Sequence, residues 1–398
     1  MKNGEEKVLN FGTVISLYWF SLYIYLGVLA PFISDRGANY TEIGVVLAFF
    51  GLAYLIFRLP VGFCFGYFRG VKVLLAVGLF LGMVSSFGFW YFTSPVILMI
   101  FRLLAGISAV IWLTYTGVPG YFNTRNADRV TGIINSFTRL GQISAVFIGG
   151  MVASFFGRGA PFLIAAVGGA SALVLVLRNR ERTPARYRVV KLSELVSLLN
   201  KRGSVLIISL LAAVYQFVIF STTFGFVPLY ASEIGAGNFQ LGLLMTLTIL
   251  ATIVGSILCG VYFVRLLGEK KMVVTGFVIL TIACSLIPFI GSVFWLYIIQ
   301  IISGIGQGFV FSLLIDMSVR NISRSNRGLV SGVFQMVYGL GMFAGPLVVG
   351  IMADLAGLSI GFWLVGGASL VGAVFSGAVI GEELFSLSLK EKIVNKLG

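Results

Sequence analysis

Two sets of glycines in this chain match one another across an interval of about 200 residues. The first half carries Gly44, Gly62, Gly70, Gly132, Gly141 and Gly150, and the second half carries Gly242, Gly260, Gly268, Gly332, Gly341 and Gly350. Self-similarity at a fixed interval indicates two copies of one structural unit. Whatever fold the first half adopts, we expect the second half to adopt as well.

The composition places this unit in a membrane. Hydrophobic residues make up 58% and charged residues 11% of the 398 residues, whereas a soluble domain has about 25% charged residues. Apolar runs of the roughly 20 residues that span a bilayer occur near 10–33, 43–66, 71–93, 95–118, 130–156, 160–177, 204–230, 240–264, 272–292, 294–316, 328–353 and 358–380. Six runs per repeat give both copies the same orientation. The sequence therefore predicts an all-α integral membrane protein with 12 transmembrane helices in two parallel six-helix bundles.

One long hydrophilic stretch divides the chain into domains. We expect an N-terminal bundle over residues 1–178, a basic cytoplasmic linker over 179–203, and a C-terminal bundle with a short cytoplasmic tail over 204–398. Apolar residues at helical spacing in the linker and in the tail 384–397 fit short helices on the membrane surface. A solvated linker is the alternative for both segments.

The basic residues predict the orientation. Of the 28 Lys and Arg, only Arg36 and Arg158 lie in the loops on one side, and the tails, the linker and the alternate loops hold nearly all the others. This positive-inside bias predicts that both termini of a multi-pass protein of the cell membrane are cytoplasmic. The net charge of +14 is then explained by the orientation of the chain in the membrane and by contact with lipid head groups. We expect no binding to nucleic acid.

The residues needed for enzyme or metal chemistry are missing. The chain has no histidine, and its three cysteines lie inside predicted helices without the spacing of metal ligands. No Gly-x-x-x-x-Gly-Lys-Ser/Thr motif occurs, and the glycine run 304–308 has no strand before it. We expect no enzymatic activity, no metal and no cofactor.

Several motifs occur in the same order in both halves. A glycine-rich helix end leads into a tight basic turn, with Gly62, Gly70 and Lys72 in the first half and Gly260, Arg265, Gly268 and Lys270 in the second. The predicted fourth helix contains Arg102-x-x-x-Gly106. Glycine elements on the predicted helices 5 and 11 comprise Gly141, Gly149 and Gly150, and Gly341, Gly345, Pro346 and Gly350.

Together these motifs resemble the major facilitator superfamily over essentially the whole chain, and the glycine elements resemble its drug and metabolite exporters. The chain departs from the family pattern at Gly66, where an acidic residue is usual, and at Ala145-Val146, where Gly-Pro is usual. The resemblance implies a monomeric secondary transporter that moves a small organic solute by alternating access, coupled to protons or another ion.

Positions at which the two repeats differ are candidates for specificity. Arg102 is matched by Gln300, and Arg139 is matched by Gly339. Small residues beside Arg102 predict free space there. A third arginine, Arg58, lies near the cytoplasmic end of its helix, where its side chain is expected to snorkel to the membrane surface.

Arg139 lies close to the predicted membrane midplane, and no acidic residue lies at the same depth; the nearest are Glu42, Asp316 and Asp354. Its partner is then either a backbone carbonyl or polar cluster, or water or an anionic group of the substrate. The candidate substrate-binding residues are Arg139, Arg102, Asn135, Gln142, Gln300, Gln307, Gln335, Tyr115 and Tyr215. The arginines form a predicted cationic wall, and the glutamines of the second half form a neutral amide wall.

The sequence thus predicts a secondary active transporter, with a preference for export by ion-coupled antiport. An uptake carrier or exchanger for an organic anion is the alternative, and a membrane-embedded lipid-processing enzyme, a flippase or a channel is a more distant one. The substrate, the direction and the coupling ion stay open.

Overall fold

The computed structural model describes residues 2–64, 71–116, 127–178, 203–320, 322–323 and 326–381. All regular secondary structure in these residues is helical, and 12 helices are long and apolar enough to cross a membrane. They lie where the apolar runs predicted them, six in each half, which confirms the predicted fold class. Segment 179–202 and the tail 384–397, with their two alternative structures, lie outside the described residues.

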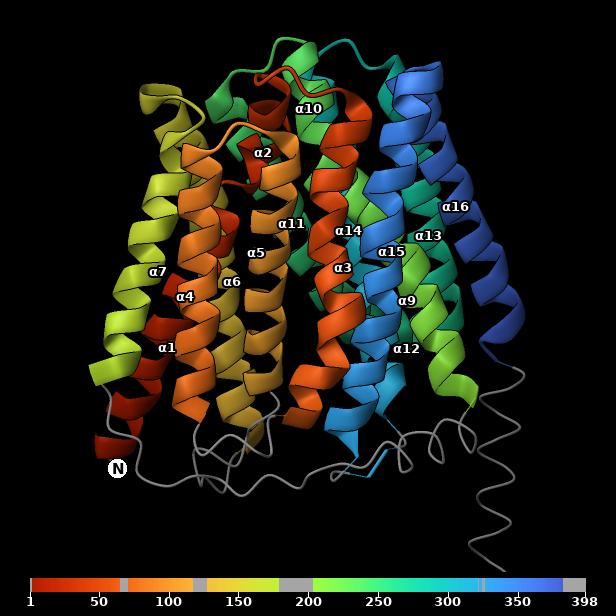
Figure 1. Ribbon diagram of the computed structural model, residues 1–398. Coiled ribbons are helices and arrows are strands. Elements are labelled where there is room, and N and C mark those ends of the chain that lie inside the picture. Colours follow the sequence, from red (N-terminus) through yellow and green to blue (C-terminus); the bar gives the residue numbers. More distant parts are fainter. Residues whose placement is uncertain are drawn as a thin grey trace, which may run out of the picture.

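The two halves stand side by side in Figure 1. The first half consists of α1 (Lys2–Tyr23), α2 (Leu26–Ser34), α3 (Tyr40–Cys64), α4 (Val71–Tyr91), α5 (Pro95–Thr116), α6 (Ala127–Phe156) and α7 (Ala160–Arg178). The second half consists of α9 (Gly203–Ser221), η2 (Thr222–Phe226), α10 (Val227–Glu233), α11 (Asn238–Leu258), η3 (Cys259–Phe263), α12 (Val264–Leu267), α13 (Glu269–Leu286), η4 (Ile287–Phe289), α14 (Val293–Val319), α15 (Arg327–Ala356) and α16 (Leu358–Val379). We call the end at which α1 begins the N-terminal face and the opposite end the distal face.

Glycines hold the helices of each half close together. Gly141 of α6 packs on the backbone of α1, where an added β-carbon would lie 2.5 Å from the carbonyl oxygen of Ser16. Gly341 of α15 packs in the same way on Ala213 of α9. Each half has one further contact of this kind, Gly149 against Ile24 in the first and Gly345 against Phe217 in the second. Small residues permit such close backbone approach between membrane helices, so the repeat in the sequence is also a repeat in the packing.

The first membrane span of each half is interrupted at a matching level, which the apolar runs did not predict. Ile24 and Tyr25 form a turn between α1 and α2, and the π-helical segment η2 separates α9 from α10. Pro228 accounts for the second interruption, because the proline ring clashes with the carbonyl group four residues earlier, that of Phe224. Irregular backbone at membrane depth is tolerated only where protein or water surrounds it. The two interruptions therefore lie within the protein and away from lipid.

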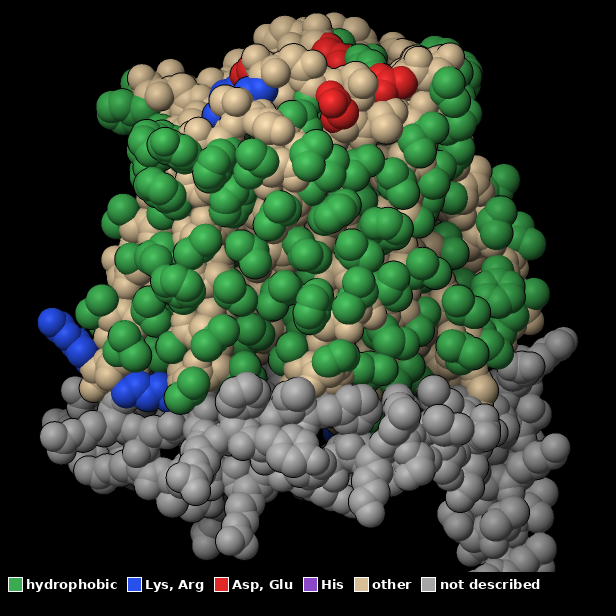
Figure 2. All heavy atoms as spheres, viewed as in Figure 1, with side chains coloured by type: hydrophobic (Ala, Val, Ile, Leu, Met, Phe, Trp, Pro, Cys, Tyr) green, Lys and Arg blue, Asp and Glu red, His purple; other side chains and the backbone are tan. Residues whose placement is uncertain are grey.

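Hydrophobic side chains cover the side of the molecule seen in Figure 2, and the charged side chains visible there lie at its two ends. Among the large apolar side chains exposed on the described helices are Ile56, Phe80, Ile100, Leu140 and Ile257. Such a continuous apolar belt is the surface expected of a protein that crosses a bilayer. The chain is therefore a multi-pass membrane protein.

Candidate functional site

At the distal face the two halves meet through paired glycines. Gly150 of α6 and Gly242 of α11 are so close that a β-carbon on either would lie 2.6 Å from the Cα of the other. The contact related to it by the repeat joins Gly44 of α3 to Gly350 of α15. There, a β-carbon on either glycine would lie 3.1 Å from the Cα of the other. Helices approach this closely only where no side chain intervenes. Four of the glycines that match between the repeats thus form the contact between the two halves.

A basic residue of the first half ties the two halves together at this face. Arg158, between α6 and α7, forms an ion pair with Asp35 of its own half, with 2.8 Å between Nη1 and Oδ1. It also donates hydrogen bonds to Oδ1 of Asn238 (2.8 Å) and to Oγ of Ser232 (2.7 Å) in the second half. One feature of the sequence points to this role, since Arg158 is one of only two basic residues in the distal loops.

An acidic residue of the second half makes the reciprocal link. The carboxylate of Asp354, near the end of α15, accepts hydrogen bonds from the backbone N–H groups of Tyr40 (3.1 Å) and Thr41 (2.8 Å) at the start of α3. A negative charge at this position also interacts favourably with the helix dipole. The hydroxyl group of Tyr40 donates a hydrogen bond to Glu233 of the second half at 2.8 Å. These links close the distal face.

An aromatic layer lies between the two halves. It is closer to the N-terminal face than the distal contacts are. Its ring pairs, with the distances between centroids, are Tyr23 with Phe224 (6.0 Å), Phe50 with Phe220 (5.9 Å) and Tyr54 with Tyr338 (5.8 Å). Each pair joins a first-half residue to a second-half residue. Aromatic contacts at these separations are favourable, so the layer reinforces the closed distal face.

The contact between α3 and α15 continues well beyond this layer. A β-carbon on Gly339 would lie 2.8 Å from that of Tyr54, and Gly332 lies against the side chain of Leu59. Because α15 covers α3 here, Arg58 is only 5% exposed and lies within electrostatic range of Tyr54 and Tyr338. The predicted snorkelling of Arg58 to the membrane surface was therefore wrong.

The contact between α6 and α11, which is related by the repeat to the contact between α15 and α3, differs at the position that matches Gly339. Arg139 of α6 occupies the place in the repeat that Gly339 has in α15. Arg139 is exposed, whereas Gly339 is buried. Asn135, one turn from Arg139, is exposed too, and its counterpart Gln335 is half-buried. The first half therefore presents an exposed stretch of α6 with a cation where the second half presents a packed helix.

The guanidinium group of Arg139 has a neutral neighbour. Its Nη1 donates a hydrogen bond to Oε1 of Gln142 at 3.1 Å. Its charge acts on Tyr23 of α1 and on Tyr215 of α9, so it lies within electrostatic range of both halves. Tyr215 is buried and stacks on Phe311 at 5.2 Å. The side chain of Tyr115 lies outside the described residues.

Arg102 lies in a different environment from Arg139. It is 1% exposed, and its Nε and Nη1 atoms have no hydrogen-bond partner among the described residues. Its guanidinium carbon lies 4.5 Å from the centre of the Phe50 ring. Burying an arginine in a membrane costs at least about 3 kcal/mol on insertion scales, and a cation–π contact returns about 0.5–2 kcal/mol. Arg102 is therefore only partly compensated.

The free space predicted beside Arg102 is absent. A β-carbon on Gly106 would lie 2.5 Å from that of Ala53, because α3 packs directly against this face of α5. The prediction failed because small residues on a helix create either a cavity or a close helix contact, and the sequence alone does not distinguish the two. Phe50 of α3 separates Arg102 from the junction of the halves.

The amide side chains of the second half lie mostly inside their own bundle. Gln300 is 2% exposed and Gln307 is 4% exposed. The amide nitrogen of Gln307 donates hydrogen bonds to Thr223 of η2 (3.0 Å) and to Ser303 (3.3 Å), so it braces the interrupted helix. Gln335 donates a hydrogen bond to Ser331 at 3.4 Å, and its carbonyl oxygen has no partner among the described residues.

The basic turns predicted as gating motifs lie at the N-terminal face. Gly62 is exposed near the end of α3, Gly70 is outside the described residues, and Nζ of Lys72 donates a hydrogen bond to the carbonyl oxygen of Leu177 at 2.7 Å. In the second half, Gly260 lies in η3, Arg265 in α12 and Lys270 in α13. Gly268, between the last two helices, has φ +79°, a left-handed conformation that favours glycine.

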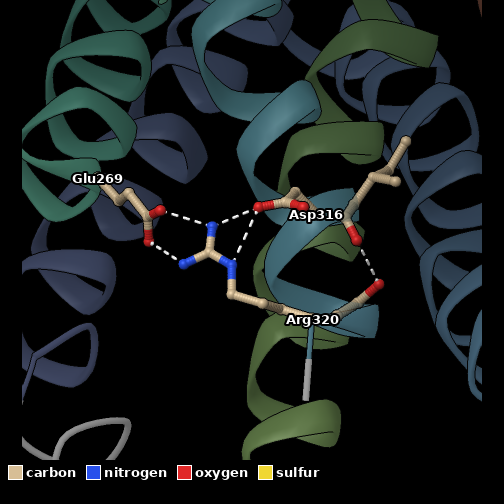
Figure 3. A network of polar contacts seen from close by, with 5 residues as sticks. Glu269, Asp316 and Arg320 are labelled. Carbon is tan, nitrogen blue, oxygen red and sulfur yellow. Dashed lines mark hydrogen bonds and ion pairs between the residues drawn. The ribbon is translucent and has the colours of Figure 1, made fainter. Parts of the chain in front are cut away.

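A charged network accompanies the second of these turns (Figure 3). Arg320 donates two hydrogen bonds to the carboxylate of Glu269 in α13, at 2.9 Å and 2.5 Å, and it also pairs with Asp316 of α14. The hydrogen bonds to Glu269, followed by those to Asp316, raise the pKa of the Arg320 guanidinium above its usual range. The network therefore links α13 to α14. Among the described residues, no group of three acidic or cysteine side chains is placed to hold a metal ion.

The three acidic residues named as nearest to membrane depth all have donors already. Asp354 and Asp316 are held as described above, and Glu42 accepts a hydrogen bond from the backbone N–H of Asn39 at 3.0 Å. Protonation of any of them would weaken these contacts.

The chain matches a family model described as Major Facilitator Superfamily over residues 11–265 and again over 209–390. It is 23% identical over 400 residues to the quinolone resistance protein NorA of Staphylococcus aureus, covering 98% of this chain and 99% of NorA. An uncharacterized MFS-type transporter of Methanocaldococcus jannaschii is 23% identical over 360 residues, 87% of this chain and 92% of the relative. The multi-drug resistance efflux pump PmrA of Streptococcus pneumoniae is 24% identical over 173 residues, 42% of this chain and 43% of the pump.

Solved structures share the fold. The nucleoside transporter NupG, crystallised as a mutant, superimposes with a TM-score of 0.77 at 18% identity, covering 94% of this chain and 99% of NupG. A bacterial homolog of the human lysosomal transporter Spinster, in an inward-facing and unoccupied conformation, gives a TM-score of 0.73 at 15% identity, covering 94% and 96% of the two chains. With its two six-helix halves, its matching glycine contacts and these relatives, the chain belongs to the major facilitator superfamily of transporters.

Proposed function

We propose that this transporter exports a small organic anion from the cytoplasm, and that Arg139 is the residue that attracts the anion. The observation that carries the proposal is the position of Arg139. Arg139 is exposed, its guanidinium group has a neutral hydrogen-bond partner in Gln142, and its charge acts on Tyr215 of the other half. A substrate carboxylate or phosphate would supply the negative charge that the described helices lack at this depth.

The closed distal face supports a direction of access. With that face sealed, a solute would reach Arg139 from the N-terminal face. The positive-inside bias assigns the N-terminal face to the cytoplasm. The solved relative in an inward-facing conformation has the same fold, and the relatives NorA and PmrA are a resistance protein and an efflux pump. These points together favour uptake of the solute from the cytoplasm and its release outside, with the halves rocking between two states.

The experiment is saturable transport in proteoliposomes of the purified protein. A thermal-shift screen first selects organic anions that stabilise the protein, and labelled anions are then tested for counterflow, which a channel does not show. We expect Arg139→Gln to abolish transport and Arg139→Lys to retain part of it, since lysine keeps the charge but loses the planar donors. Arg178→Gln, which removes an exposed charge at the end of α7, is the matched control. Normal transport by Arg139→Gln would exclude the proposal.

An exchanger for organic anions is the second candidate. The observation that favours it is that Glu42, Asp316 and Asp354, the acidic residues nearest to membrane depth, already accept hydrogen bonds or ion pairs. A transport rate that does not depend on an imposed pH gradient, but that requires an anion on the opposite side of the membrane, would favour exchange. Transport driven by the pH gradient would favour proton antiport.

A further inference from the structure

Arg102 is a buried cation at the level where the first membrane span is interrupted. The hydroxyl group of Tyr25, in the turn between α1 and α2, lies beside its guanidinium group. The Tyr25 hydroxyl acts directly on the guanidinium group, and the Nε and Nη1 atoms of Arg102 have no hydrogen-bond partner among the described residues. These groups place hydrogen-bond donors and one positive charge at a single buried point.

The surroundings hold the two groups in place. The Tyr25 ring stacks on Phe162 at 4.8 Å and on Phe89 at 6.3 Å, and all three residues are fully buried. Arg102 is held by α3, which packs against α5 beside it. A charge fixed among aromatic rings, away from water, binds a counter-ion more strongly than the same charge at a surface.

Phe50 covers this point on the side that faces the second half. Its ring lies 4.5 Å from the guanidinium carbon of Arg102 and 5.9 Å from the ring of Phe220. Phe50 is itself only partly buried, so it separates Arg102 from the junction of the two halves. Separation of the halves at the distal face would withdraw Phe220 and free the Phe50 ring to turn away.

We propose that Arg102 and Tyr25 form a binding site for one monovalent anionic group, a halide ion or a carboxylate, and that Phe50 is its lid. In the conformation described here the face of the Phe50 ring takes the place of the anion. Arg102 is 1% exposed and lies behind Phe50, whereas Arg139 is exposed, so the two arginines are accessible to different degrees in this conformation. The inference concerns binding at equilibrium and does not rest on the proposed export function.

The test is the thermal stability of the purified full-length protein titrated with chloride, bromide or benzoate, with gluconate keeping the ionic strength constant. We expect a saturable rise in melting temperature for the wild type and no rise for Arg102→Gln. Tyr25→Phe should raise the half-saturating concentration about tenfold, the cost of one hydrogen bond to a charged group. Phe50→Leu should lower it, because the lid and its cation–π contact are both removed. Arg178→Gln, which removes an exposed charge at the end of α7, should respond like the wild type.

A response to halides alone identifies an inorganic ion as the ligand, and a response to benzoate alone identifies a carboxylate; both support the site. No saturable response of the wild type to any of the three anions would overturn the inference. So would an unchanged response in Arg102→Gln, or a response lost in Arg178→Gln. If Arg102→Gln does not fold, the Tyr25→Phe and Phe50→Leu variants decide, because a merely structural role would not shift the half-saturating concentration in opposite directions.

Discussion

Gly150 of α6 and Gly242 of α11 face one another across the boundary between the halves, and each leaves the space that the backbone of the other fills. The neighbouring Asn238 fixes the same contact, since its side-chain amide donates a hydrogen bond to the carbonyl oxygen of Ala153 at 3.0 Å. The halves can therefore close at the distal face only while both positions lack a side chain.

A valine at Gly242 should hold the distal face open. The added carbon atoms would collide with the backbone at Gly150 and with the carbonyl oxygen of Val146, which lies 2.7 Å from the position of a β-carbon. We expect the distance between spin labels at Ser154 and Ala356, both exposed at this face, to lengthen in Gly242→Val and to a smaller extent in Gly242→Ala. Gly367→Val in α16, where nothing lies within 4 Å, is the control. Unchanged label distances in Gly242→Val would contradict this account of the closure.

Loss of Arg158 should loosen the same face by a smaller amount. An exposed ion pair is worth only about 0.2–1 kcal/mol, but Arg158 also donates hydrogen bonds to Asn238 and Ser232 across the boundary. Arg158→Gln should therefore increase the population with long label distances several-fold, and Asp35→Asn should have a weaker effect because Asp35 lies in the same half as Arg158. High salt should reduce the difference between Asp35→Asn and the wild type. Equal effects of the two variants would show that the bonds across the boundary do not contribute.

The repeat predicted the scaffold because packing between membrane helices depends on small residues at fixed spacing. Glycines such as Gly141 and Gly341 are recognisable in a sequence, since they recur in register and have one physical role. The lengths and limits of the helices follow from hydropathy for a similar reason. The interruption at Ile24 and Tyr25 leaves no such mark, because neither residue is unusual in a helix.

Side-chain environments were harder to predict than helices. Arg58, Arg102 and Arg139 are alike in the sequence, yet the first is covered by α15, the second lies behind Phe50 and the third is exposed. The difference comes from the helix that packs against each arginine, which is distant in the sequence. For the same reason the link from Asp354 to the start of α3, which joins residues more than 300 positions apart, could not be predicted from local patterns.

The difference between Gly339 and Arg139 gives a prediction about the scaffold. Gly339→Ala should destabilise the contact between α3 and α15, because the new methyl group would lie 2.8 Å from the β-carbon of Tyr54. Overpacking of this kind typically costs about 1–3 kcal/mol. The melting temperature of the purified protein should fall accordingly. The matched variant Arg139→Ala meets no such neighbour and should fold with little loss. A similar loss in both variants would mean that the two contacts between the halves are packed alike.

The network around Arg320 gives a prediction about pH. The raised pKa of Arg320 means that its contribution to folding is fully present below the pKa of the unfolded chain and is lost only as the pH rises through the still higher pKa of the folded state. Stability from this network should thus be constant between about pH 7 and about pH 10. Arg320→Gln should lower the melting temperature by a similar amount at both limits, because Glu269 and Asp316 then face each other without a cation. The loss should be small, of the order of 1 kcal/mol, since the Arg320 side chain is 44% exposed. Arg320→Lys should recover part of it, and a loss that disappears toward pH 10 would show that the arginine does not stay charged.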